Sequence, residues 1–104
     1  MTESLIKVAT LDELPLNTNK AVKVNGRSIL LCRTDAGVFA VENRCSHMLA
    51  ELEGGRMRGC HLFCPKHSAR FDMRTGATAG ALTKEPIQAF AVAVDEDGNI
   101  ALDW

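Results

Sequence analysis

Short runs of apolar residues, separated by turn-forming residues, fill the first half of the chain. Apolar and polar residues alternate over 22–24, and an Asn-Gly pair at 25–26 leads into an apolar run over 28–32. An Asn-Gly pair between two such runs is the strongest short-range signal for a two-residue β-hairpin. A second turn at 35–37 precedes the apolar run 38–41. The pattern predicts three consecutive antiparallel strands.

The second half of the chain continues in the same way. A glycine pair at 54–55 marks a turn, and residues 56–63 are expected to form one strand. Apolar residues then alternate over 90–94 and again over 100–104, on either side of an Asp-Gly turn at 97–98. Alternation with a period of two is the signal of a half-buried strand. We expect this last hairpin to close the sheet.

Helical signals are confined to one short segment. Thr10 and Glu13 have the spacing of a capping box, and Pro15 ends the turn soon afterwards. The chain shows no repeat, low-complexity tract or linker, and its 104 residues suit one domain over 1–104. The predicted fold class is all-β.

Charge and composition exclude several classes of partner. The formal net charge is −1 and 24% of the residues are charged, which argues against nucleic acid and against an anionic membrane surface. The N-terminus has no basic start followed by an apolar stretch, and no run approaches the roughly 18 apolar residues of a membrane span. We therefore expect a soluble, cytoplasmic protein.

Two short cassettes each combine one cysteine with one histidine. They are Cys45-Ser46-His47 and Cys64-Pro65-Lys66-His67. Sulfur and nitrogen donors suit zinc or iron, but ordinary zinc sites place two cysteines in one knuckle and two histidines in the other. A two-iron cluster can take both cysteines on one iron and both histidines on the other. The leading hypothesis is a [2Fe–2S] cluster, and zinc stays open as the alternative.

With these cassettes and the segments 69–72 and 74–76, the chain resembles the Rieske-type ferredoxins of bacterial ring-hydroxylating dioxygenase systems. The resemblance covers almost the whole chain. It implies a Rieske-type antiparallel β-sandwich with a small cluster-binding subdomain, formed by two loops at approximately 44–50 and 63–72. It also implies that Cys45 and Cys64 bind the inner iron, and that His47 and His67 bind the outer, more exposed iron.

The resemblance implies an electron carrier that is not itself an enzyme. Such a carrier takes single electrons from an NAD(P)H-dependent flavin reductase, the ferredoxin reductase, and passes them to a terminal oxygenase in aromatic hydrocarbon catabolism. A catalytic oxygenase iron needs two more histidines and a carboxylate, and His61 is the only histidine left. Two alternatives remain: the Rieske-like small subunit of an assimilatory nitrite reductase, and a zinc-stabilised binding module.

Three positions near the second cassette qualify the resemblance. Ser68 stands where the family usually has glycine, which puts the local turn in question. Ala69 and Phe71 stand where high-potential relatives have a serine and a tyrosine that donate hydrogen bonds to cluster sulfurs. Neither side chain has a donor, so we expect a reduction potential near the low end of the Rieske range.

The two remaining cysteines have different expected roles. Cys32 lies in the apolar run 28–32 and is predicted to be a small buried residue that serves packing. Cys60 lies four positions before Cys64 and, with His61, is the basis of a rival ligand set.

Overall fold

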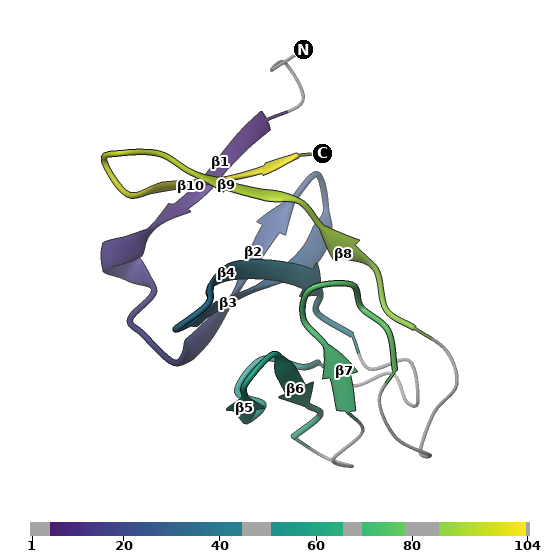
Figure 1. The fold of residues 1–104 in the computed structure, drawn as a ribbon. Helices are drawn as coiled ribbons and strands as arrows, with labels where there is room; N and C mark the ends of the chain where they lie inside the picture. Colours follow the sequence, from purple (N-terminus) through teal and green to yellow (C-terminus); the bar gives the residue numbers. More distant parts are fainter. Residues whose placement is uncertain (1–4, 45–50, 66–69, 79–85, 104) are drawn as a thin grey trace.

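The computed structural model describes residues 5–44, 51–65, 70–78 and 86–103. These segments form ten strands and a single-turn 3₁₀ helix, η1 (Leu11–Glu13) (Figure 1). The strands, in chain order, are β1 (Leu5–Thr10), β2 (Thr18–Val24), β3 (Arg27–Thr34), β4 (Gly37–Glu42), β5 (Met57–Arg58), β6 (His61–Phe63), β7 (Arg70–Asp72), β8 (Ala89–Phe90), β9 (Val92–Val94) and β10 (Asn99–Asp103). The predicted all-β class is confirmed.

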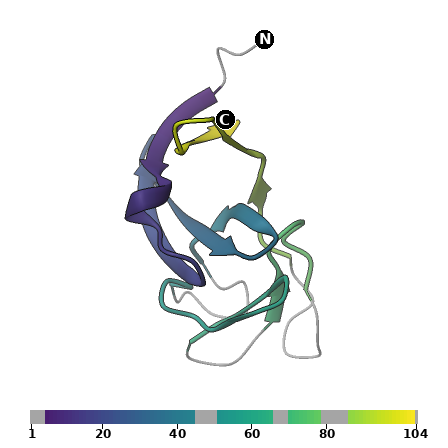
Figure 2. The same ribbon diagram turned by 60° about the vertical axis from the view of Figure 1, so that its left-hand side comes forward.

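All strand pairs are antiparallel, and they form three sheets. The strand orders are β1-β10-β9, β2-β3-β4-β8 and β5-β6-β7. The four-stranded sheet lies between the other two, with the three-stranded β5-β6-β7 sheet, here called the small sheet, at the opposite end from the chain termini (Figures 1 and 2). The protein is therefore layered, with β3 and β4 in the middle.

The predicted hairpins of the first half are present. Asn25 and Gly26 have φ values of 50° and 83°, as a type I′ turn requires at both central positions. They join β2 to β3 with Val24 opposite Arg27. The next turn joins β3 to β4, and Thr34 pairs with Gly37. The local turn residues thus fix the register of the central sheet.

Strand β3 is buried on both faces. Ile29 and Leu31 are fully buried on one face, and Leu30 and Cys32 are fully buried on the other. Successive side chains of a strand point to opposite faces, so β3 contributes to two separate cores. The sandwich core consists of Ala9, Leu14, Val24, Ile29, Leu31, Ala40, Ile100 and Leu102. The small-sheet core consists of Leu30, Cys32, Val41, Leu52, Leu62, Cys64, Phe71, Met73 and Ile87.

The alternating residues 90–94, which were expected to form one strand, belong to two strands in different sheets. Only Ala91 separates β8, which pairs with β4, from β9, which pairs with β10. The amide of Asp103 donates to the carbonyl of Ala91 at 2.9 Å, so this joint is itself hydrogen-bonded. As predicted, a turn at Gly98 leads into β10, which completes its sheet as the strand between β1 and β9. Trp104 lies outside the described residues.

One other expectation is wrong and one is confirmed. The predicted strand 56–63 is a hairpin, because Gly59 adopts a φ of 59° and a two-residue turn then pairs Arg58 with His61. The Thr10 amide donates to the Glu13 carboxylate at 2.9 Å, as the capping box predicts, and the helix is one short 3₁₀ turn. Within the described segments, no helix has the length and apolarity needed to cross a membrane.

Truncating Leu31 tests the layered arrangement. Leu31 is fully buried in the sandwich core, so Leu31→Ala is expected to lower the free energy of unfolding by about 2–5 kcal/mol through lost burial and a cavity. Leu16 is 50% exposed, and Leu16→Ala serves as the matched control with a change of about 0.5 kcal/mol or less. Urea unfolding measures both. Equal losses in the two variants would contradict the assigned burial.

Candidate metal centre

Of the four predicted ligands, the structure describes Cys64. Cys64 directly follows β6, is 2% exposed and belongs to the small-sheet core. Phe63 pairs with Arg70, so residues 64–69 connect β6 to β7, and the predicted loop 63–72 begins and ends in paired strand residues. Cys45, His47 and His67 lie outside the described residues, as do Ser68 and Ala69.

Both ends of the first cassette segment are held by the side chain of Asn43. This residue follows β4, lies two positions before Cys45 and is 4% exposed. Its Oδ1 accepts hydrogen bonds from the amides of Leu52 and Glu53 at 2.8 and 2.9 Å. Its Nδ2 donates to the hydroxyl of Ser28 on β3 at 3.0 Å. The backbone just after β4 and the backbone at Leu52 and Glu53 are therefore both bonded to the same side chain, that of Asn43.

The turn 52–55 connects the hydrogen bonds of Asn43 to the strand that precedes the second cassette. The Gly55 amide donates to the Leu52 carbonyl at 2.9 Å, and the side chain of Asn19 bonds the backbones of Gly54 and Gly55 at 2.8 and 2.9 Å. A Cβ at Gly55 would overlap the carbonyl oxygen of Phe63, so only glycine allows this approach. Phe63 immediately precedes Cys64, so the turn 52–55 packs against the strand that leads into the second cassette.

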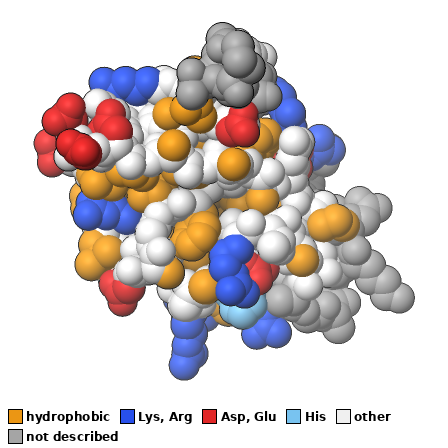
Figure 3. Space-filling view, turned by 45° about the horizontal axis from the view of Figure 1, so that its top comes forward, with side chains coloured by type: hydrophobic (Ala, Val, Ile, Leu, Met, Phe, Trp, Pro, Cys, Tyr) orange, Lys and Arg blue, Asp and Glu red, His pale blue; other side chains and the backbone are white. Residues whose placement is uncertain are grey.

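The segment after the second cassette is fixed by a turn and an ion pair. The Arg74 guanidinium lies 2.8 Å from the Asp72 carboxylate, and its hydrogen bond lowers the pKa of Asp72 below the usual value. Figure 3 shows basic, acidic and histidine side chains lying together on one face. Gly76 has a φ of 80° and packs its backbone against Ile87, where a Cβ would overlap a carbonyl oxygen. The Arg-Thr-Gly motif thus has a structural role.

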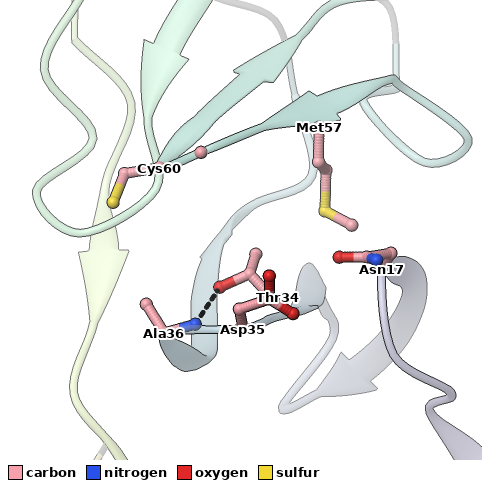
Figure 4. A pocket seen from close by; sticks show the side chains of 7 residues that line it. Asn17, Thr34, Asp35, Ala36, Met57 and Cys60 are labelled. Carbon is pink, nitrogen blue, oxygen red and sulfur yellow. Dashed lines mark hydrogen bonds between the residues drawn. The ribbon is translucent and has the colours of Figure 1, made fainter.

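Cys60 lies away from Cys64. It occupies the turn between β5 and β6, beside a pocket of about 160 Å³ lined also by Met57, Thr34 and Asp35 (Figure 4). The extended strand β6 separates it from Cys64 by on the order of 10 Å, whereas thiolate ligands lie about 2.3 Å from zinc. Among the described residues no group of three potential ligands forms a metal site. Cys60 and Cys64 are therefore too far apart along β6 to bind one zinc ion together, and the rival ligand set with Cys60 and His61 stays a prediction.

Cys32 has the predicted packing role. Its side chain is fully buried in the small-sheet core, and burial raises the pKa of the thiol to about 12. A thiol in this environment stays protonated and unreactive at neutral pH.

The described residues fit a cluster that is bound between two loops. A hollow of about 350 Å³ is lined by Gly54, Arg56, Phe63, Cys64 and Pro65, where the turn after the first cassette meets the second. Cys64 supplies a shielded sulfur donor there.

The comparison with known families decides the identity of the domain. The model of the Rieske [2Fe-2S] domain matches residues 4–97. This chain belongs to the Rieske [2Fe-2S] domain family. Its cofactor is accordingly one [2Fe-2S] cluster, which favours iron–sulfur over the zinc alternative. The arrangement of antiparallel sheets in the described residues is the Rieske fold.

Similar proteins are ferredoxin components of dioxygenase systems. The ferredoxin component of the naphthalene 1,2-dioxygenase/salicylate 5-hydroxylase systems of Ralstonia sp is 36% identical over 96 residues, covering 91% of each chain. The ferredoxin of carbazole 1,9a-dioxygenase from Nocardioides aromaticivorans IC177 has a TM-score of 0.89 and 34% identity, covering 96% of this chain and 97% of that one. On the basis of these similarities, this Rieske protein is an electron-transfer component and not a catalytic enzyme.

Two further structures bear on partners and on the alternatives. A ferredoxin solved in a complex of reduced oxygenase and oxidized ferredoxin of carbazole 1,9a-dioxygenase has a TM-score of 0.86 and 26% identity, covering 97% of this chain and 94% of that one. A putative NADH-dependent nitrite reductase small subunit from Mycobacterium tuberculosis has a TM-score of 0.85 at 19% identity, covering 94% and 92% of the two chains. The second likeness shows the shared fold alone.

Sequence reasoning missed Asn43 and Asn19. The side-chain partners of Asn43 lie 9, 10 and 15 positions away along the chain, and those of Asn19 lie 35 and 36 positions away, so no local pattern reveals these hydrogen bonds. The only signal in the sequence is an asparagine just after the predicted strand 38–41, close to a ligand.

The raised pKa of Cys32 predicts an alkaline loss of stability. The ordinary pKa is 9.0 and the folded value is about 12, so above pH 9 the unfolded chain releases a proton that the folded chain keeps. The free energy of unfolding therefore falls as pH rises through this window. Between pH 8 and 10 the wild type should lose about 1 kcal/mol more than Cys32→Ala. Urea unfolding at both pH values measures the difference.

A second Cys32 variant serves as the control on the cofactor. Cys32→Ser should leave the visible spectrum of the cluster unchanged, because the side chain serves packing. A bleached cluster in that variant, or equal pH dependence in the wild type and Cys32→Ala, would contradict the packing role.

Proposed function

We propose that this protein takes single electrons from an NAD(P)H-dependent flavin reductase and passes them to a terminal ring-hydroxylating oxygenase. The observation that carries the proposal is the Rieske domain match together with relatives that are named ferredoxin components of dioxygenase systems. The ferredoxin complexed with an oxygenase supports the choice of electron acceptor. The reductase partner follows from the same systems, and we place the protein in the cytoplasm as a single domain over 1–104.

The proposed ligands divide between the two irons. Cys45 and Cys64 hold the inner iron, and His47 and His67 hold the outer one. The near-complete burial of Cys64, at 2% exposure, supports an inner position. When bound, the cluster accepts and releases one electron at a time. Neutral imidazoles in place of two thiolates remove negative charge from its surroundings, so uptake of an electron is easier than at an all-cysteine site.

The test is a spectroscopic and chemical analysis of the isolated protein. Two irons and two acid-labile sulfides per chain, with a low average g value in the paramagnetic resonance spectrum after dithionite reduction, are expected for a Rieske centre. His67→Ala should abolish this spectrum, and His61→Ala is the matched control that should keep it. A silent spectrum with one zinc per chain, or an unchanged cluster in His67→Ala, would refute the proposal. Stable co-purification with a large catalytic subunit would point to the nitrite reductase alternative.

The reduction potential provides a separate prediction. The side chains of Ala69 and Phe71 have no hydroxyl, so neither donates a hydrogen bond to a cluster sulfur. Phe71 is fully buried in the small-sheet core. We expect a potential on the order of −150 mV, near the low end of the Rieske range. Ala69→Ser should raise it by supplying a donor. Protein-film voltammetry measures both, and a wild-type value well above zero would contradict this reasoning.

A further inference from the structure

We propose that Asn43 is a positioning residue that sets the separation of the two cysteine-bearing segments of the cluster site. The inference rests on the proposed function, because it takes Cys45 and Cys64 as ligands. Asn43 itself touches no ligand atom in the described structure. Its effect is transmitted through the backbone segments that lead into each cassette.

The first part of the argument is the bonding of Asn43. Its backbone amide donates to the Ser28 carbonyl at 3.1 Å, and its Nδ2 donates to the Ser28 hydroxyl at 3.0 Å. These two bonds fix Asn43 to the start of β3 in the central sheet. Both acceptor sites of its Oδ1 are filled by the amides of Leu52 and Glu53. One buried side chain thus joins the entry and the exit of the segment 44–51, which carries Cys45.

The second part is the connection to Cys64. Leu52 begins the turn whose Gly55 packs directly on the carbonyl of Phe63. The Phe63 amide donates to the Arg56 carbonyl at 2.8 Å, which holds β6 against the same segment. Cys64 is the next residue and is buried. A shift at Leu52 would therefore displace the backbone next to Cys64 as well as the end of the first cassette segment.

Asn19 provides a comparison within the same turn. It also makes two hydrogen bonds to backbone, but with Gly54 and Gly55, and it reaches them from β2. It makes no described contact with the segment that continues into Cys45. If the role of Asn43 were only to stabilise the turn, loss of either asparagine would have the same effect on the cluster.

The experiment compares three variants of the cluster-loaded protein with the wild type. Asn43→Leu removes the amide at similar volume, and Asn19→Leu removes the same kind of bonds, which go to Gly54 and Gly55. Ser28→Ala removes one bond of Asn43 while keeping its two bonds to Leu52 and Glu53. The readouts are the visible circular dichroism of the oxidised cluster, its g values after reduction, and the rate of iron release to a chelator. The urea midpoint of each protein is measured alongside.

The expected result separates positioning from stability. Asn43→Leu leaves two backbone amides without their acceptor, one of them buried, so iron release should be on the order of ten times faster and the dichroism and g values should change. Asn19→Leu and Ser28→Ala should keep wild-type spectra and release iron within about twofold of the wild-type rate. Asn43→Asp keeps an oxygen acceptor for both amides and should restore the wild-type spectral shape.

Three outcomes would overturn the inference. They are wild-type spectra and iron release in Asn43→Leu, equal effects in Asn43→Leu and Asn19→Leu, and loss of the cluster in Asn43→Asp. If Asn43→Leu does not fold, loss of the cluster in Asn43→Asp or in Ser28→Ala still overturns the inference. A wild-type protein without a mixed-ligand spectrum would refute the proposed function itself, whereas normal wild-type spectra with unaffected variants would refute only the role of Asn43.

Discussion

Burial of β3 on both faces is the constraint on which the rest of the structure depends. A strand without a polar face cannot lie at the surface, so each side must be covered by another layer. Ile29 and Leu31 are covered by the β1-β10-β9 sheet, and Leu30 and Cys32 are covered by the small sheet. Each fully buried aliphatic side chain contributes about 1.5–3 kcal/mol. The cluster end of the molecule is therefore attached to the same strand that holds the sandwich together.

Strands whose ends are set by a neighbouring turn were predicted correctly. Features that depend on which strands lie side by side were not. The Asn25-Gly26 turn carries its own conformational preference, so β2 and β3 were placed correctly. The break at Gly59 was missed because one glycine is also compatible with the interior of a strand, and its left-handed φ is not evident from its neighbours. The change of sheet at Ala91 was missed because it depends on which strand lies alongside, and the alternation of side chains continues through it.

The candidate site shows the same division between local and long-range determinants. The two cassettes are evident from the spacing of cysteine and histidine, since ligand chemistry is local to each. The scaffold that brings them together consists of hydrogen bonds from Asn43 and Asn19 and of a glycine contact between Gly55 and Phe63. These pairs join residues that are not neighbours in the chain, so no local pattern in a single sequence predicts which residues pair.

The pairing of β1 with β10 sets an order of events during synthesis. Leu5 lies opposite Asp103, so the first strand finds its partner only when the last strand has left the ribosome. The strands of the central and small sheets lie within residues 18–90 and are available earlier. A nascent chain therefore exposes the Ile29 and Leu31 face of β3 until β10 has been synthesised. Transiently exposed apolar surface is prone to misassembly, so the sandwich core is the part of the fold that is vulnerable until β10 is available.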